Sequence, residues 1–456
     1  MRIRFTWMVA IPALIVTGFL LACSTKYSTS SNGLVVVPTQ GSEVMETFSL
    51  DLATGRVSQI NNVNGPPTPG LPGAVVLDPA GAFAYVIVNQ ASGLPGGSTG
   101  VVSFKVGSDG KLAAGSTPTA MQPTSPTVNV PCVTPGSTTI PVGVQPTPVI
   151  PGSLAIDSAG KYLFVADVAT SGTTQSYTCN GTTQTSAVPV PGTISVFSVS
   201  NGALTEVAGS PFALPGESTA SGGSAASGSA PSASALAVTP TVRPIQFAPC
   251  SGLAPLTAEH LYVTDSVNGV LLNYTVSSSG VLSLVPVSIT QPGVTSGTTP
   301  SGVAVDACGQ FVYVANGGSN NVSAYTICNA ITQSCPVADY SVHEVSGSPF
   351  PAGDVPGPIA VDPFAKYVYV VDAGSSQVSG FRISPASGSL TAIAGTPLAT
   401  NSGANSIAIR ADGSWIFVAN FNTGNVSQYA ITQATGQLTA EAPFTTLNYP
   451  SGVAVK

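Results

Sequence analysis

The sequence repeats one pattern of short apolar segments seven times, and this repetition constrains the fold more than any other feature. The clearest copy runs from Val355 to Thr400 and contains four β-branched segments, "GPIAVD", "YVYVVD", "QVSGFRI" and "LTAIAG". Alternation with period two, and turn residues between the segments, predict that each segment is a strand. Four antiparallel strands in about 45 residues are typical of one blade of a β-propeller.

The second and third strands of the repeat can be followed along the whole chain. The third strand recurs from "EVMETFSL" to "NVSQYAI". The second strand ends at Thr39 in a weaker first copy, and in the other copies at a polar residue: Asn89, Asp167, Asp265, Asn316, Asp372 and Asn420. The sequence therefore predicts an all-β fold, a seven-bladed β-propeller of four-stranded antiparallel blades, as a single domain over residues 33–456.

The first strand of the repeat precedes the second to seventh copies but is missing from the first copy. The chain ends in "SGVAVK", which has the sequence of that missing strand. We expect Val453 to Val455 to pair with Leu34 to Val37 and to close the ring. Such closure removes the open sheet edge that otherwise promotes aggregation.

These strand segments resemble the YVTN-repeat, lactonase-type seven-bladed propeller family, known from 6-phosphogluconolactonase-like proteins and many exported bacterial proteins. The resemblance covers about residues 34–456 and rests on the segments recurring in order. It implies the propeller fold and, as an activity, hydrolysis of a sugar lactone by histidine, arginine and acidic side chains around the central channel.

The N-terminus has the three parts of an export signal, which are basic residues, an apolar stretch and small residues. The segment "LLAC" resembles the lipobox of bacterial lipoproteins. We expect a signal peptide over residues 1–22, lipidation of Cys23 and a flexible tether over residues 23–32. The expected location is the cell envelope, lipid-anchored at the outer membrane or cell surface. An ordinary cleaved signal or an uncleaved anchor is the alternative.

Composition is typical of a turn-rich exported β protein. Only 7% of the residues are charged, and Gly and Pro together number 88. Removal of Arg2 and Arg4 with the signal changes the formal charge from −7 to −9, because 10 basic and 19 acidic residues then remain. Nucleic acid is therefore not an expected partner, since its phosphates require a basic face.

Insertions interrupt the repeat in the second and third copies. They are "QASGLPGGST" after Asn89 and the stretches at about residues 117–150, 170–191 and 213–233. Connections after the second and fourth strands of a blade emerge on one face, so all four insertions belong to the same face. We expect a partner there, an envelope protein or a polar small molecule. The alternative is that these are tolerated loops without function.

Six cysteines remain once Cys23 is lipidated, an even number in an exported protein. The blade assignment pairs cysteines that lie on the same face or in the same connection. It predicts three disulfides: Cys132–Cys179, Cys250–Cys308 and Cys328–Cys335. A zinc site is the alternative, but the sequence has no Cys-x-x-Cys motif, so we predict neither metal nor cofactor.

No catalytic residue is predicted, because no carboxylate pair, Ser/His/Asp set or phosphate-binding loop with a lysine can be assembled. We assign His260 and His343 to ordinary surface or edge positions, and we interpret Arg410 as having a surface partner in Asp412. The polar ends of the second strands, from Asn89 to Asn420, form a candidate ring at the channel mouth. That ring could bind a cation or polar ligand, or each side chain could bond its own turn.

Three functions are compatible with these observations. The first is a monomeric, lipid-anchored propeller that acts as a ligand- or protein-binding platform. The second is a lactonase-like hydrolase, which requires a titratable residue with a perturbed pKa at the channel. The third is a structural surface protein.

Overall fold

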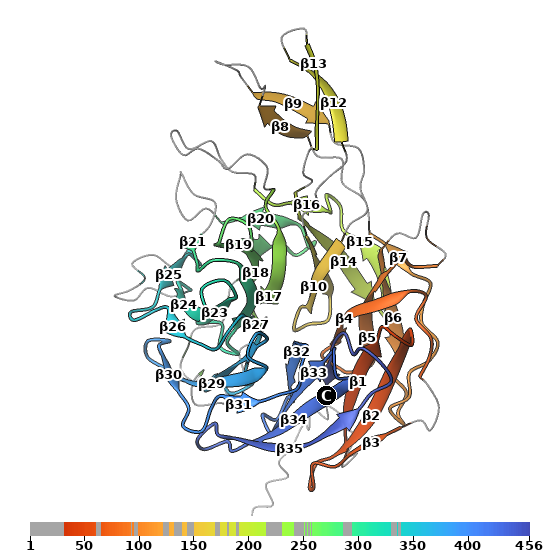
Figure 1. Ribbon diagram of the computed structural model, residues 1–456, viewed down its shortest axis with the longest axis vertical. Helices are drawn as coiled ribbons and strands as arrows, with labels where there is room; N and C mark the ends of the chain where they lie inside the picture. Colours follow the sequence, from red (N-terminus) through yellow and green to blue (C-terminus); the bar gives the residue numbers. More distant parts are fainter. Residues whose placement is uncertain are drawn as a thin grey trace, which may run out of the picture. The chain divides into compact units, whose positions relative to one another are not determined.

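Seven radially arranged β-sheets form the body of the chain in the computed structural model (Figure 1). The predicted all-β, seven-bladed propeller is thereby confirmed, and residues 32–456 form one unit. The structure describes residues 32–456 except 61–64, 93, 95–98, 122–126, 132–138, 144–149, 169–173, 180–181, 188–190, 216–229, 241–249, 251–252, 254–255, 257, 286–293, 330–334 and 336–338. The predicted signal peptide, tether and lipidated Cys23 lie outside the described residues.

Each blade has an innermost, a second, a third and an outer strand. The innermost strands, from blade 1 to blade 7, are β36 (Ala454–Val455), β4 (Leu71–Leu77), β10 (Ile150–Ile156), β17 (Ala233–Val238), β22 (Pro300–Val305), β27 (Pro356–Val361) and β32 (Ala404–Ile409). The second strands are β1 (Asn32–Thr39), β5 (Phe83–Asn89), β11 (Tyr162–Val168), β18 (Glu259–Asp265), β23 (Phe311–Asn316), β28 (Tyr367–Asp372) and β33 (Trp415–Asn420).

The third strands complete the pattern read from the sequence. They are β2 (Val44–Asp51), β6 (Gly100–Lys105), β14 (Thr193–Ser200), β19 (Val270–Val276), β24 (Asn321–Ile327), β29 (Gln377–Ile383) and β34 (Asn425–Ile431). The outer strands of blades 1, 2 and 7 are β3 (Val57–Gln59), β7 (Thr119–Ala120) and β35 (Leu438–Thr445).

In blades 3 to 6 the outer strand consists of two short pieces, which the repeat pattern did not predict. Both pieces pair with the same third strand. They are β15 (Ala203–Glu206) and β16 (Phe212–Ala213), β20 (Leu282–Leu284) and β21 (Val294–Thr295), β25 (Val342–Glu344) and β26 (Phe350–Pro351), and β30 (Leu390–Ala392) and β31 (Leu398–Ala399). A turn with Pro separates the pieces in three of these blades, and Pro cannot donate a ladder hydrogen bond.

Two insertions carry hairpins of their own. The hairpin of β8 (Thr127–Pro131) and β9 (Thr139–Gly143) follows blade 2, and that of β12 (Thr174–Cys179) and β13 (Thr182–Ala187) lies within blade 3. A further long connection, residues 239–258 in blade 4, follows an innermost strand and so belongs to the opposite face. The repeat pattern did not identify this connection as an insertion.

The hydrophobic core lies between blades rather than within one of them. Each neighbouring pair of blades encloses its own buried cluster, because both faces of a blade's second and third strands pack against a neighbour. The aromatic residue of the second strand is fully buried in these clusters, as Tyr85, Phe164, Tyr262, Tyr313, Tyr369 and Phe417. Packing of this kind requires a neighbour on each side, which favours a closed ring.

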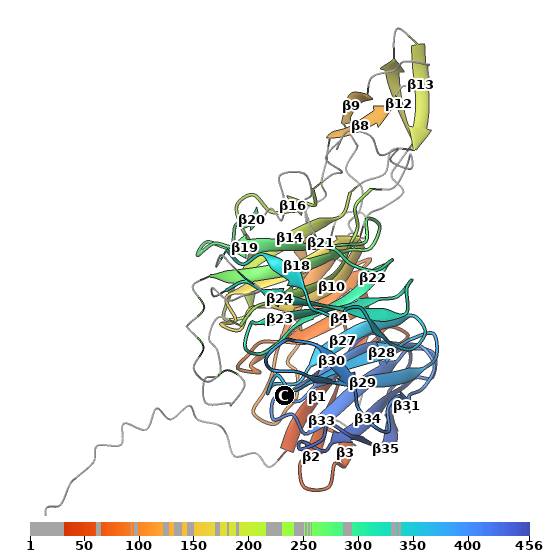
Figure 2. The ribbon, with the colours of Figure 1, turned by 90° about the vertical axis from the view of Figure 1, so that its left-hand side faces the viewer.

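The C-terminal strand closes the ring as the sequence predicted. β36 pairs antiparallel with β1, with Val455 opposite Val35 and Ala454 opposite Val36. The backbone N–H of Lys456 donates to the carbonyl of Leu34 at 2.9 Å. The first and last blades, red and blue, consequently lie side by side in both views (Figures 1 and 2).

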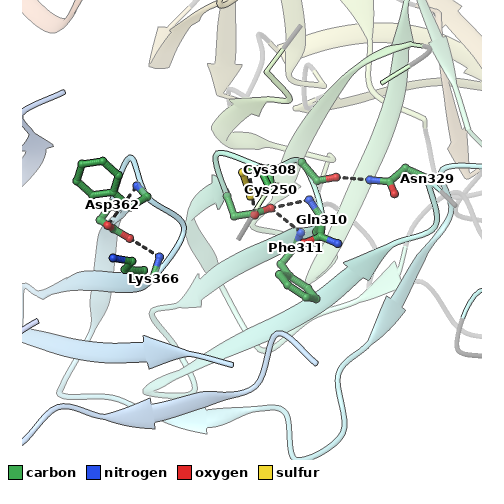
Figure 3. Close-up of a disulfide and its surroundings, with 10 residues drawn as sticks. Cys250, Cys308, Gln310, Phe311, Asn329, Asp362 and Lys366 are labelled. Carbon is green, nitrogen blue, oxygen red and sulfur yellow. Dashed lines mark hydrogen bonds between the residues drawn. A yellow bond between two sulfur atoms is a disulfide. The ribbon is translucent and has the colours of Figure 1, made fainter. Parts of the chain in front are cut away.

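The antiparallel blades give the ring two distinct faces. We call the lower face the one where innermost strands end and second strands begin, and the upper face the one where second strands end and third strands begin. A repeated turn on the lower face is held by an aspartate. In blade 5, for example, Asp306 accepts hydrogen bonds from the N–H groups of Gln310 and Phe311 at 2.6 and 2.7 Å (Figure 3).

Two of the three predicted disulfides are present on the lower face. Cys250–Cys308 joins the long connection of blade 4 to the turn of blade 5, with 5.2 Å between the Cα atoms (Figure 3). Cys328–Cys335 closes the connection that follows β24, also at 5.2 Å. The third predicted pair, Cys132–Cys179, falls outside the described side chains.

Candidate functional site

The centre of the ring is lined by strands without charge. The seven innermost strands contain no Asp, Glu, Lys, Arg or His. Several of their hydroxyls connect neighbouring blades: Ser234 Oγ donates to the carbonyl of Pro300, and Ser301 Oγ to that of Pro356, both at 2.7 Å. These strands therefore consist of apolar groups, backbone, hydroxyls and the amide of Asn405, and contain no group that titrates near neutral pH.

The polar residues at the upper ends of the second strands bond mainly to their own turns and third strands. Asn316 Oδ1 and Asn420 Oδ1 also accept hydrogen bonds from Ser296 and Thr400, in the connections from the preceding blades. In blades 5 and 7 the amide Nδ2 atoms of Asn316 and Asn420 donate to the Oγ atoms of Ser323 and Ser427, both at 2.9 Å. The same amides also donate to the next asparagines of their own turns, Asn321 and Asn425. These side chains hold the second and third strands together at the upper face.

The other members of the predicted ring follow the same plan with different partners. Asp265 Oδ1 accepts hydrogen bonds from the N–H groups of Ser232, Val267 and Asn268. Asn89 accepts a longer one, of 3.3 Å, from Thr99 Oγ1. Within the described part of the chain, no member of the ring is hydrogen-bonded to another, and no group of three His, Cys, Asp or Glu side chains is placed to hold a metal ion.

Desolvation perturbs the ionisation of two carboxyl groups of this set, those of Asp167 and Asp372. Asp167 Oδ2 accepts hydrogen bonds from Thr193 Oγ1 at 2.8 Å and Ser195 Oγ at 3.0 Å. Desolvation nevertheless outweighs these bonds and raises the pKa of Asp167 to about 7. Desolvation likewise raises the pKa of Asp372 to about 6, although Ser379 Oγ donates to its carboxylate at 2.6 Å.

The upper face carries a hollow between blades 4 and 5, with a volume of about 610 Å³. The loops after β18 and β23 and the connection into β22 form its walls. Apart from Val267, the residues that line it are hydroxyl, amide and glycine residues: Ser266, Asn268, Gly269, Ser296, Gly297, Thr298, Thr299, Ser319 and Asn321. Such walls suit a neutral ligand that exchanges many hydrogen bonds.

Large apolar side chains are exposed on this same face. Among the described residues these are Val267, Val355 and Tyr449, with 45%, 52% and 50% of their surface accessible. Val355 and Tyr449 directly precede innermost-strand segments and have left-handed backbone, with φ of 50° and 53°. A β-branched residue seldom adopts that conformation, and such strain concentrates at functional surfaces. The ring of Tyr449 also packs on that of Phe421, with centroids 5.1 Å apart.

Positive charge is confined to the opposite face. Every lysine and arginine in the described part of the chain lies in a lower-face turn or at a lower strand end: Arg56, Lys105, Lys111, Lys161, Lys366, Arg382, Arg410 and Lys456. Arg410 pairs with Asp412, as the sequence predicted. The two faces thus differ in chemistry, with neutral hydroxyls and exposed apolar groups above and cations below.

The histidines have unlike environments. His343 is exposed in β25, as expected. The expectation was wrong for His260, which is only 1% exposed in the central strand β18. Its ring stacks on Tyr340, with centroids 4.2 Å apart, and its Nδ1 bonds Asn273 Oδ1 at 2.9 Å. His260 lies two residues before Tyr262, at a position that Tyr162, Phe311, Tyr367 and Trp415 hold in other blades. It is therefore buried by packing between blades, and desolvation lowers its pKa.

Comparison with known proteins agrees with the predicted resemblance. Residues 333–456 match the family described as "Lactonase, 7-bladed beta-propeller". None of the curated proteins compared with the chain matches it.

Solved structures of the same architecture extend the likeness over nearly the whole chain. A candidate 6-phosphogluconolactonase from Bacteroides fragilis has a TM-score of 0.62 at 16% identity, covering 94% of this chain and 99% of its own. A periplasmic gluconolactonase from Pseudomonas aeruginosa has a TM-score of 0.60 at 14% identity, covering 93% and 99%. A functionally unknown protein from Desulfotomaculum acetoxidans has a TM-score of 0.57 at 15% identity, covering 93% and 99%. At such identities the likeness establishes the fold.

Proposed function

We propose that this seven-bladed propeller of the lactonase type is a binding module of the bacterial cell envelope, anchored through lipid at Cys23. Its upper face would take up a neutral, polyhydroxylated ligand of the sugar class. The hollow between blades 4 and 5 carries the proposal, because its walls are hydroxyl, amide and glycine groups without any charge. Ser, Thr and Asn side chains can exchange hydrogen bonds with sugar hydroxyls, and Val267 offers an apolar surface to a sugar ring.

A glycan-binding assay tests this proposal. We expect the whole protein to bind neutral oligosaccharides on a glycan array. Titration calorimetry should confirm this binding in solution. Replacing both Val267 and Thr298 by alanine should weaken binding about tenfold, because one apolar contact and one hydroxyl are lost. Val355→Ala is the matched control, since Val355 is equally exposed on the same face but outside the hollow. Equal binding by the wild type, the double variant and Val355→Ala would contradict the proposal.

Hydrolysis of a sugar lactone is the second candidate, favoured by the family match of residues 333–456. Asp372 is one acidic group that could serve, because a pKa of about 6 places it near the working pH of a general base. Against this role, its carboxylate is buried and bonded to Ser379. We expect gluconolactone to open at its spontaneous rate in a pH-stat assay. Turnover that disappears in Asp372→Asn would establish the hydrolase instead.

A further inference from the structure

Blade 6 departs from the repeat at its lower-face turn. At the left-handed position of this turn blades 2, 3, 5 and 7 have glycine, with φ between 62° and 67°: Gly81, Gly160, Gly309 and Gly413. Blade 6 has Ala365, with φ of 54°. Alanine in that conformation is unfavourable by about 1 kcal/mol. Its methyl group packs on the buried disulfide Cys250–Cys308 of the neighbouring turn, which holds it in place.

The strained turn forms one wall of a lower-face pocket of about 380 Å³ between blades 6 and 7. Its floor is apolar, since Ala365, Tyr367 and Ile383 are buried. Lys366 and Arg382 are exposed at its rim (Lys366 is labelled in Figure 3). The other lining residues are Pro385, Gln433 and Ala434, so no acidic side chain lines the pocket.

The two cations come from repeat positions that can be compared around the ring. Lys366 directly precedes the second strand, and Arg382 is the cross-strand partner of that strand's first residue, Tyr367. The corresponding pairs in blades 1 to 5 and 7 are Gly33 and Ser49, Ala82 and Lys105, Lys161 and Ser198, Glu259 and Thr275, Gln310 and Thr326, and Ser414 and Ala430. Blade 6 alone has a cation at both positions.

Blade 3 shows what a structural lysine does at the position of Lys366. Lys161 Nζ donates to the carbonyl of Ser278 in the next blade at 2.6 Å, and the hydroxyl of Tyr162 donates to the same carbonyl. In blade 6 the hydroxyl of Tyr367 makes the corresponding bond to the carbonyl of Gln433. The ammonium of Lys366, however, forms no hydrogen bond or ion pair with the described part of the chain, and lies 5.6 Å from the centroid of the Phe364 ring.

Arg382 is only partly engaged. One guanidinium nitrogen donates to the carbonyl of Ala434 at 3.3 Å, and the group lies 5.7 Å from the centroid of the Tyr367 ring. The nearby acids are occupied elsewhere. Asp362 is buried, and its carboxylate accepts hydrogen bonds from the backbone N–H groups of Phe364, Lys366 and Tyr367. Asp412 forms an ion pair with Arg410. Both cations therefore keep donors for a ligand.

We propose that this pocket binds a small organic anion. A carboxylate or phosphate group would lie between Lys366 and Arg382, which are suited to such oxyanions, and the carbon skeleton would rest on Tyr367 and Ile383. The site is on the face opposite to the proposed glycan hollow and does not depend on it. Two sources share this chemistry, a free metabolite and the headgroup of an anionic phospholipid.

Titration of the whole protein in detergent at low ionic strength tests the site, with citrate and glycerol 3-phosphate as probes. We expect saturable binding by calorimetry. Lys366→Gln should weaken it, and the double variant with Arg382→Gln should lower the affinity at least about tenfold, because charge-assisted hydrogen bonds are lost. Lys161→Gln removes a lysine from the same repeat position and should bind as the wild type does. Equal melting temperatures without probe show that the exposed substitutions leave the fold intact.

A second arm distinguishes the two sources. Glycerophosphoglycerol, the soluble headgroup of phosphatidylglycerol, is titrated under the same conditions. Tighter binding of this diester than of citrate assigns the pocket to a lipid headgroup, and the reverse order assigns it to a free metabolite. Absence of binding by all three probes, or affinities that are equal in the wild type and the double variant, would overturn the proposal.

Discussion

The polar residues that end the second strands show how one position can carry two chemistries. Asn316 and Asn420 use an amide to donate to a serine of the third strand, whereas Asp167 accepts hydrogen bonds from Thr193 and Ser195. Both arrangements hold two strands together at the upper face. They differ in their response to pH, because only the carboxyl group can ionise within the buried site.

Burial of Asp167 should make the protein less stable as pH rises. Its folded-state pKa is about 7, above the ordinary aspartate value of 3.8, so the folded state binds more protons than the unfolded state between these pH values. The contribution of Asp167 to the free energy of unfolding is fully present below about pH 4 and is lost as pH rises through 7. Asp167→Asn should remove this dependence and stabilise the protein at pH 8 by up to a few kcal/mol.

Urea unfolding from pH 4 to pH 8 measures this effect. The reciprocal control is Asn420→Asp, which places a carboxyl group in the equivalent site of blade 7 and should introduce a loss of stability at high pH. If the stability of Asp167→Asn depends on pH as that of the wild type does, the raised pKa of Asp167 does not cause the loss of stability at high pH.

At the scale of elements, strand order and pairing follow from the repeat, and departures from it identify special sites. The glycine of the lower-face turn is replaced by Ala365 only where a disulfide packs against the methyl group. That replacement is visible in the sequence, as "DPFAKY" beside "DACGQF", but the sequence does not show that a disulfide packs against the alanine. The sequence alone does not bring Arg382 and Lys366 together, because their relation depends on the register of β28 and β29.

Closure of the ring by β36 should contribute strongly to stability. Deleting residues 450–456 removes the buried side chains of Val453 and Ala454 and leaves the edge of β1 unpaired. We expect the free energy of unfolding to fall by about 3–5 kcal/mol and the protein to self-associate through the exposed edge. Urea midpoints and light scattering measure the two effects.

The control for this deletion is Lys456→Ala, which keeps the strand and removes only an exposed bond from Nζ to the carbonyl of Ala80. It should behave as the wild type does. A deleted protein that stays monomeric with an unchanged midpoint would show that the ring does not need its final strand.

At the scale of the whole molecule, the two faces have separate chemistry. Uncharged hydroxyls and exposed apolar side chains gather on the upper face, and the lysines and arginines of the described chain lie on the lower one. The described chain also begins at the lower face, where β1 starts.

Lipid anchoring can be tested by Cys23→Ser. A serine cannot carry the thioether-linked lipid, so most or all of the protein should be lost from the detergent-soluble membrane fraction. Labelling of the protein with radioactive palmitate should disappear as well. Cys328→Ser serves as the control for replacement of a cysteine outside the N-terminal segment, because Cys328 forms a disulfide within the propeller. Retention of Cys23→Ser in the membrane fraction without label would indicate an uncleaved apolar anchor instead.

The sequence alone determined the number of blades, the strand order and the closing strand, because each depends on periodic patterns along the chain. It also allowed pairing of the cysteines at 250, 308, 328 and 335, since the blade assignment places them in shared or adjacent connections. Only the tertiary structure decided that the polar strand ends bond mainly within their blades, that His260 is buried, and that Lys366 and Arg382 share a pocket. These features arise where side chains from separate turns meet, and the distances between them depend on strand register and blade packing.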